Sequence, residues 1–459
     1  MKSDLGKCGW IFVLLLLVCS SCMSPQRQAE LYCKAGVTKS QSGYRSDAMV
    51  YFSDAIKLNP KYEDAYLARG TTKQALLDLG AAIKDYDTVI ELNPSNEPAL
   101  YDRGLCKLGL KDNSGAVADF SKAIELYPDD ANAYNYRGLA RAHLRDLNGA
   151  LADFNKVVEL TPQEATAYRN RAAVETLLKE YEKALADASK AIELDGNDAF
   201  SYRIRGDTKA TLKNFHDALA DFDKAIELTP AAAEAYAGRG DVKMESDDFE
   251  GASTDFEKAI QLNPKSALAF FGCAFLKEKR GDDPGALADF NRAVELSPQF
   301  AETYASLGLL QYNLSDWRPA LENLRKALAL GSLTDDPRFY IWLIQSQSGK
   351  TDDAKKELET FLNSLQGEKA TNWTASIGHF LIGDLPEDEF LNQATTKAKR
   401  PSAIKGQICE SFYYAGMKHK LAGDKQGAAD LFQKCLDTGD DNSFGYMSAK
   451  VELRAMKQP

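Results

Sequence analysis

The chain has 459 residues, of which 44% are hydrophobic and 27% are charged, and its formal net charge at pH 7 is −11. Acidic residues outnumber basic ones by 67 to 56, and no basic segment dominates the sequence. Proteins that bind nucleic acid usually carry clustered positive charge. Because this sequence does not, nucleic acid is not an expected partner.

The first 22 residues are organised like a secretory signal. Two lysines give a weakly basic start, and residues 10–18 form a short apolar run, WIFVLLLLV. This run is too short for a membrane-spanning helix, which needs about 20 apolar residues. The small residues Ser20 and Ser21 follow it and stand directly before Cys22. The segment therefore predicts export of the chain and removal of the signal.

Two small residues and a cysteine after an apolar run resemble the lipobox of bacterial lipoproteins. The resemblance implies cleavage before Cys22 and attachment of lipid to its thiol and its new amine. Met23 stands where that family places aspartate for retention in the inner membrane, which implies the outer membrane. One departure is Cys19, where the family prefers leucine. The alternative is an ordinary secretory signal that is cut nearby; in either case residues 23–28 are expected to be a short tether.

From residue 29 to residue 334 the sequence repeats nine times at a spacing of 34 residues, without an insertion. We number positions from the first residue of each copy, at 29, 63, 97 and onward. Position 8 is Gly or Ala, position 20 is always Ala, position 24 is mostly aromatic, and position 32 is mostly Pro. Spacings of three and four residues place side chains on one helical face. Each copy is therefore predicted to form two antiparallel helices that the proline ends.

The order aromatic, small, Ala, aromatic, Ala and Pro over 34 residues resembles the tetratricopeptide repeat (TPR). The resemblance implies an all-α fold, a right-handed superhelix (α-solenoid) of helix-turn-helix repeats with a helical C-terminal cap. It also implies a non-catalytic protein that binds other proteins or peptides on a concave face lined by the first helix of each repeat.

A second regularity concerns charge. Position 7 is Arg and position 23 is Asp in six consecutive copies, and we predict that these residues pair between the two helices of a repeat. The alternative is a row of ligand-binding arginines. Matching numbers of donors and acceptors favour the structural interpretation. The expected pairs are Arg69 with Asp85, Arg103 with Asp119, Arg137 with Asp153, Arg171 with Asp187, Arg205 with Asp221, and Arg239 with Asp255.

After residue 334 the repeat becomes irregular. Residues 335–408 begin with a degenerate repeat in which bulky Trp342 occupies the small position 8. We expect its opening helix to be shifted by one turn and followed by a shorter loop. A terminal helix is expected to cover the end of the stack, as repeat arrays require. Further helices are predicted at 372–382 and 387–396, then a last repeat at 409–442 and a final helix near 444–456, within a capping segment at 443–459.

This C-terminal third resembles the NlpI-type TPR lipoproteins, through the degenerate repeat, a Gly-Asp-Leu linker at 383–385 and a Tyr-Tyr-x-Gly motif at 413–416. The resemblance implies a lipid-anchored adaptor at the periplasmic face of the outer membrane, which docks cell-wall (peptidoglycan) hydrolases or a periplasmic protease. It also suggests a homodimer. The chain departs from that family by its many uniform repeats. An assembly factor of a secretion or pilus complex, a role of other TPR lipoproteins, is the alternative.

No sequence motif indicates chemistry. The four histidines do not stand at metal-ligand spacings, and no nucleophile or phosphate-binding motif is complete. The five cysteines beyond the signal are odd in number, scattered and free of Cys-x-x-Cys spacing, so we expect neither a disulfide framework nor a zinc site. No catalytic, cofactor-binding or metal-binding residue is predicted, and the chain is not expected to be an enzyme.

Partner-binding residues are predicted from the positions that TPR relatives turn to the concave face, which are positions 2, 5, 9 and 12 of each first helix. Apolar residues exposed there are the stronger signal. Phe271 and Phe275 either serve a partner or pack on a neighbouring helix, and Arg169 and Arg203 either hold a carboxylate or are solvated. The three predicted zones are Tyr101, Leu105, Leu108, Asn135 and Leu139; Arg169, Arg203 and Asp207; and Phe271, Phe275, Leu309 and Tyr312.

Overall fold

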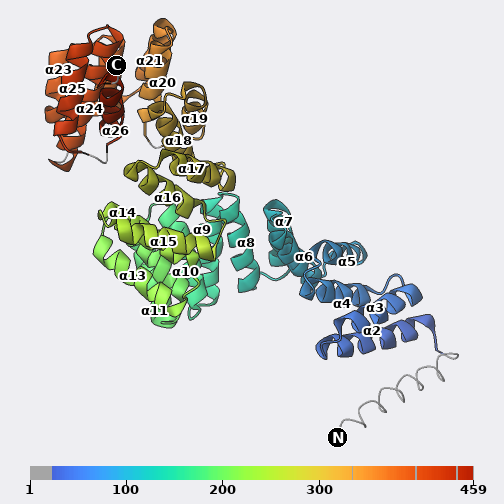
Figure 1. Cartoon of the computed structure of the whole chain (residues 1–459). Helices are drawn as coiled ribbons and strands as arrows, with labels where there is room; N and C mark the ends of the chain where they lie inside the picture. Colours follow the sequence, from blue (N-terminus) through green and yellow to red (C-terminus); the bar gives the residue numbers. More distant parts are fainter. Residues whose placement is uncertain (1–22, 333, 398–400, 441–442, 458–459) are drawn as a thin grey trace. The chain divides into compact units, whose positions relative to one another are not determined.

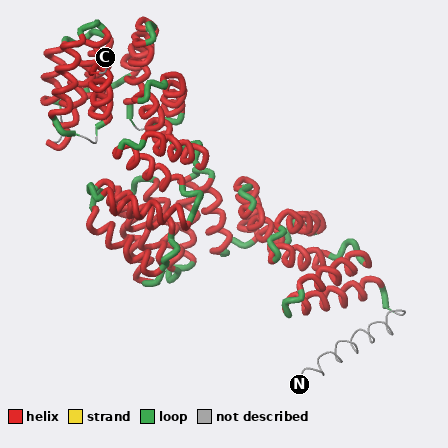
Figure 2. Tube along the Cα trace, in the orientation of Figure 1, coloured by secondary structure: helices red, strands yellow, loops and turns green. Residues whose placement is uncertain are grey.

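The computed structural model describes residues 23–332, 334–397, 401–440 and 443–457. In these ranges every regular element is helical, with 25 α-helices and one short 3-10 helix (Figure 1). Figure 2 shows that only short loops separate the helices. The chain divides into two compact units, residues 1–230 and 231–459. Each unit is a succession of antiparallel helix pairs, which confirms the predicted all-α class built from helix-turn-helix repeats.

In its described part, residues 23–230, unit 1 contains six helix pairs. Its first helices are α2 (Pro25–Gln41), α4 (Glu63–Ala75), α6 (Glu97–Gly109), α8 (Ala131–His143), α10 (Ala165–Leu177) and α12 (Ala199–Thr211). Its second helices are α3 (Arg45–Leu58), α5 (Leu79–Leu92), α7 (Asn113–Leu126), α9 (Leu147–Leu160), α11 (Tyr181–Leu194) and α13 (Phe215–Leu228).

The start of α2 corrects the prediction that residues 23–28 are a tether. The helix begins at Pro25, so most of that segment is helical. The Ser24 hydroxyl caps it by accepting a hydrogen bond from the Arg27 amide at 3.4 Å. Proline also suits the first helical position, because its missing amide proton would have had no partner there.

Among its described residues, unit 2 begins with four helix pairs and ends with one short 3-10 helix and five further α-helices. The first helices are α14 (Ala233–Glu245), α16 (Ala267–Arg280), α18 (Ala301–Asn313) and α20 (Asp336–Gln347). The second helices are α15 (Phe249–Leu262), α17 (Asp283–Leu296), α19 (Trp317–Ala329) and α21 (Thr351–Ser364). After them come η2 (Gly367–Thr371), α22 (Trp373–Ile382), α23 (Glu387–Thr396), α24 (Pro401–Leu421), α25 (Lys425–Asp437) and α26 (Phe444–Lys457).

Small residues set the distance between the two helices of each repeat. The nine alanines at position 20 are all fully buried. The ring at position 24 lies over the residue at position 8, since a Cβ added to Gly240 would stand 2.9 Å from the Phe256 ring. The same ring reaches the next repeat, where a Cβ on Gly272 would stand 2.4 Å from it. The aromatic residue therefore joins two repeats, and larger neighbours would overpack the core.

The degenerate repeat does not shift as predicted. α20 and α21 are separated by three residues, 348–350, which is also the length of the turn at 76–78 in a regular repeat. Trp342 is buried at position 8, and position 24 holds Leu358 in place of a ring. The two side chains line the same small cavity. In this repeat the large side chain therefore stands on the first helix and the smaller one on the second, the reverse of a regular repeat. Because the two changes compensate in volume, both helices keep the bounds that they have in a regular repeat.

The last helices fold back along unit 2. The Ser448 hydroxyl of α26 donates a hydrogen bond to Asn313 of α18 at 2.7 Å, and lies 3.2 Å from the Tyr340 hydroxyl of α20. The Tyr413 hydroxyl of α24 donates to Tyr312 of α18 at 3.1 Å. The terminal helix was predicted to cover the end of the stack. In the structure α26 packs on α25 and α24, the two helices of the last repeat, and α24 and α26 also contact the first helices α20 and α18.

Candidate functional site

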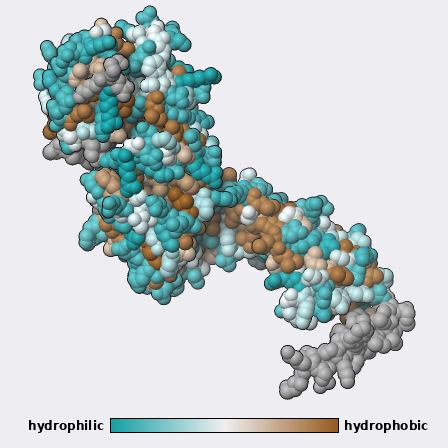
Figure 3. Space-filling view, viewed as in Figure 1, coloured by the Kyte–Doolittle hydropathy of each residue, from teal (hydrophilic) through white to brown (hydrophobic). Residues whose placement is uncertain are grey.

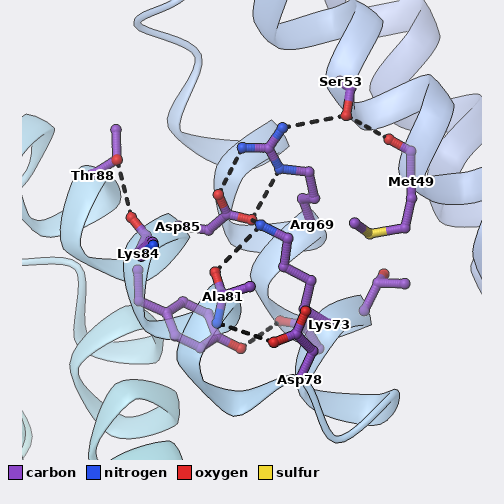
Figure 4. A network of polar contacts seen from close by, with 12 residues as sticks. Met49, Ser53, Arg69, Lys73, Asp78, Ala81, Lys84, Asp85 and Thr88 are labelled. Carbon is purple, nitrogen blue, oxygen red and sulfur yellow. Dashed lines mark hydrogen bonds and ion pairs between the residues drawn. The ribbon is translucent and has the colours of Figure 1, made fainter.

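The predicted arginine–aspartate pairs form in all six repeats. In each, the arginine Nη2 lies 2.6–2.8 Å from a carboxylate oxygen of the aspartate. In the second repeat Arg69 also donates through Nε to Asp85 at 2.9 Å, which makes the contact bidentate (Figure 4). The aspartates are buried, so the N–H groups of the arginine replace the water molecules that would otherwise bind each carboxylate.

The network contains a second cation that was not predicted from the sequence. At position 11 a lysine or arginine contacts the same aspartate, as Lys73 does for Asp85 at 2.7 Å (Figure 4). The remaining guanidinium nitrogen reaches the preceding repeat, where Arg103 donates to Asp87 at 2.6 Å. The guanidinium groups are thus used to join helices and repeats, which favours the structural interpretation over ligand binding. We call the arginine, the position-11 residue and the aspartate of a repeat its charge triad.

The fifth repeat breaks this pattern, because its position 11 is Glu175. The side chain is buried, 4.0 Å from Arg171 Nε, and its Oε2 atom has no hydrogen-bond partner among the described residues. Burial raises the pKa of Glu175 to about 7, and the charge of Asp187 adds to the shift. The charge triad of the fifth repeat therefore holds two carboxyl groups and one cation.

We call positions 2, 5, 9 and 12 of the first helices the first-helix face. In unit 1, Tyr101, Leu105 and Leu108 of α6 are half-buried on this face. They pack around Phe120, with the Tyr101 and Phe120 ring centroids 5.7 Å apart. Leu139 of α8 is half-buried as well. Hydrophobic atoms are accordingly visible at the surface over α6 and α7 (Figure 3).

The polar residues predicted on this face already have partners within the chain. Arg169 lies 3.3 Å from Asp198, and Arg203 lies 2.5 Å from Asp207. The Asn135 side-chain oxygen accepts a hydrogen bond from the neighbouring repeat at 2.8 Å. A carboxylate of a partner would therefore share these arginines with the aspartates of the chain.

Two exposed residues of the first-helix face were missed. Phe200, at position 2 of α12, is 58% exposed, and the Arg169 guanidinium lies 5.5 Å from its ring centroid. Leu268, at position 2 of α16, is 41% exposed. Both residues stand at position 2, one of the positions that TPR relatives turn to the concave face, so they could have been predicted from the sequence.

A hollow of about 650 Å³ also opens on the first-helix face, between α2 and α4. Cys33, Val37, Leu67 and Thr71 line it from positions 5 and 9. Burial raises the pKa of Cys33 to about 11, so the thiol stays protonated and unreactive at neutral pH. The lining of the hollow is mixed, with polar side chains such as Thr38, Asp64 and Thr72 beside the apolar ones.

In unit 2 the predicted zone is largely filled by the chain itself. Leu309 and Tyr312 are only 2% and 4% exposed, so the prediction that they bind a partner is wrong. The reason is that α24 and α26 lie against α18. Phe271 is half-buried, with its ring 5.8 Å from that of Phe290, as the packing alternative expected. Phe275 is half-buried next to Lys279.

Within the ranges that the structure describes, no group of three or more His, Cys, Asp or Glu side chains is arranged to hold a metal ion. In the same ranges, no helix has both the length and the apolar character needed to cross a membrane. The predicted signal and its lipidation site, Cys22, lie outside the described residues.

Comparison with known families agrees with this architecture. Models described as tetratricopeptide repeats match residues 29–62, 67–131, 101–165 and 233–266, and a TPR repeat model matches residues 278–315. The chain therefore carries tetratricopeptide repeats in both units. Proteins built from such repeats are generally non-catalytic scaffolds that bind protein or peptide partners. No curated protein matches the chain.

Three solved structures are similar to parts of the chain. A tetratricopeptide repeat protein from Parabacteroides merdae is 20% identical, with 54% of this chain and 98% of that chain covered and a TM-score of 0.48. MamA from Desulfovibrio magneticus is 22% identical, with 37% and 96% covered and a TM-score of 0.36. The PilF protein of Pseudomonas aeruginosa is 18% identical, with 49% and 100% covered and a TM-score of 0.41.

Proposed function

We propose that the protein is a non-catalytic adaptor of the bacterial cell envelope, held by lipid on Cys22, which binds protein partners on the first-helix face of unit 1. The observation that carries the binding surface is Phe200, a large aromatic side chain that is 58% exposed and lies beside the Arg169 guanidinium group. Exposed aromatic groups beside arginine are typical of the residues that dominate protein interfaces.

The surroundings of Phe200 support binding of a peptide with an apolar group and a carboxylate. Its ring offers the apolar contact, and Arg169 stacks on it while bonding to Asp198. The Nε atom of Arg203, three residues along α12, is buried without a hydrogen-bond partner in the described part of the chain. A partner carboxylate would reach the part of this guanidinium group that is in solvent, where it would share the group with Asp207.

The first experiment identifies the partner. A photo-crosslinking amino acid is placed at position 200 in living cells, and the captured proteins are identified by mass spectrometry. Tyr127 is the matched control, because it is 59% exposed but caps the second helix α7 and lies off the first-helix face. Capture of cell-wall hydrolases or a protease from position 200 would support the adaptor. Secretin or pilus components would favour an assembly factor, and capture from position 127 alone would contradict the proposed surface.

Replacing Phe200 by serine is expected to weaken binding of the identified partner by about 30-fold, since loss of an interface aromatic costs about 2 kcal/mol. The melting temperature should stay unchanged, because the ring is mostly in solvent. Affinity is measured by calorimetry with purified chain and partner. Tyr127→Ser should leave the affinity as it is. Equal affinities of the two variants would remove Phe200 from the binding surface.

The envelope part of the proposal rests on the N-terminal sequence. In cells, Cys22→Ala is expected to abolish incorporation of a labelled fatty acid and to move the chain from the membrane fraction to the soluble fraction. Cys33→Ala, a change at a cysteine buried within the repeats, should affect neither. The lipid assignment fails if the Cys22→Ala chain stays with membranes and keeps its label.

A further inference from the structure

The last repeat carries cysteines at two facing small positions. Cys409 on α24 and Cys435 on α25 stand at positions 1 and 27 of the copy at 409–442. In the first repeat the same two positions are Ala29 and Ala55, which are fully buried in one cluster. The repeat geometry therefore brings these positions together, and the last copy places a thiol on each side.

The two sulfur atoms lie 2.7 Å apart, and both side chains are fully buried. Two unbonded sulfur atoms at this distance repel strongly. In a disulfide bond the distance is about 2.05 Å, so a movement of less than an ångström separates this contact from the bonded state. The three other described cysteines, Cys33, Cys106 and Cys273, are on different repeats.

We propose that Cys409 and Cys435 form a disulfide bond that joins α24 to α25. The two thiols give up two protons and two electrons as the S–S bond forms, and a disulfide oxidant such as oxidised glutathione is reduced to two thiols. The bond closes during folding, before burial makes the sulfur atoms inaccessible. Exported proteins meet such oxidants, whereas cytosolic ones do not. The inference does not depend on the identity of a partner.

The bond would reinforce the part of unit 2 that ends the array. Tyr413 stands one turn after Cys409 on α24, and its hydroxyl donates to Tyr312. On its outer side the last repeat packs against the single helix α26, which supports it less than a full neighbouring repeat would. A link from α24 to α25 keeps the helix that covers α18 in place.

Peptide mapping tests the bond directly. The full chain is unfolded, refolded in a buffer of reduced and oxidised glutathione, alkylated in denaturant without reductant, and digested with trypsin. Residues 406–418 and 435–450 should appear as one linked species, about 2 Da lighter than the two reduced peptides together. Cys273, buried without a second cysteine beside it, should be alkylated. Full alkylation of both peptides would overturn the proposal.

Thermal unfolding gives a second readout. Reduction of the refolded chain is expected to lower its melting temperature by on the order of 5 °C, because the bond lowers the conformational entropy of the unfolded state. Cys409→Ala and Cys435→Ala restore the residue that the first repeat uses, so both variants should fold and should not respond to reductant. Cys273→Ala should respond as the unaltered chain does. A melting temperature that is insensitive to reductant in the unaltered chain would contradict a stabilising bond.

Discussion

Replacing Asp119 by alanine is expected to lower the free energy of unfolding by about 3–5 kcal/mol, since it removes the anion of a buried charge triad. Asp119 is 2% exposed, and its two oxygens contact Arg103 at 2.6 Å and Lys107 at 2.8 Å. Without the carboxylate, two mostly buried cations face each other, and among the described residues the only negative charge still bonded to Arg103 is that of the partly exposed Asp87. Urea unfolding of the full chain, followed by circular dichroism, measures the loss.

Asp87→Ala is the matched control for this prediction. Asp87 contacts the same arginine at 2.6 Å, but its side chain is 45% exposed. An exposed pair is worth less than about 1 kcal/mol, because water and salt screen it. If both variants lose the same free energy of unfolding, then the burial of Asp119 does not increase its contribution to stability, and the prediction is wrong.

Replacing Glu175 by lysine is expected to raise the free energy of unfolding at pH 8 by about 2–3 kcal/mol. The change restores the cation that the other charge triads carry at position 11, where Lys209 lies 2.7 Å from Asp221 and Lys243 lies 2.8 Å from Asp255. It also removes a buried carboxylate with an unpartnered oxygen within the described residues. Chemical unfolding at several pH values measures the gain.

The gain should depend on pH in a defined direction. The pKa of Glu175 is about 7 in the folded chain, against a usual value of 4.5, so the folded state binds this proton more tightly than the unfolded state does. Its carboxyl group therefore costs least stability below about pH 4.5, and the cost grows as the pH rises through about 7. The advantage of lysine should grow over the same interval, and Glu175→Gln should remove this pH dependence without adding a cation.

Glu182→Lys is the charge-matched control, because Glu182 lies exposed on the neighbouring helix α11. A surface change of this kind should stay within about 0.5 kcal/mol. If Glu182→Lys stabilises the chain as much as Glu175→Lys, then the lower net negative charge explains the gain and the triad does not.

The sequence alone determined the repeated helix pairs, because the signals are local. The pattern lies within 34 residues: it consists of helical periodicity, small residues at fixed positions and, in most copies, a terminating proline. It occurs in nine consecutive copies. The same local spacing predicted the Arg–Asp pairs. It also placed the helices at 372–382 and 387–396, which the structure has at Trp373–Ile382 and Glu387–Thr396.

Which residues of the first-helix face remain accessible depends on segments that are distant in the sequence. Leu105 and Leu309 share position 9 of their repeats, yet one is half-buried and the other is 2% exposed. The difference comes from α24 and α26, which follow α18 by about a hundred residues and return to lie against it. The distance between Cys409 and Cys435 likewise depends on packing between helices. A helix forms from bonds between near neighbours along the chain, whereas exposure is set by segments that meet only in space.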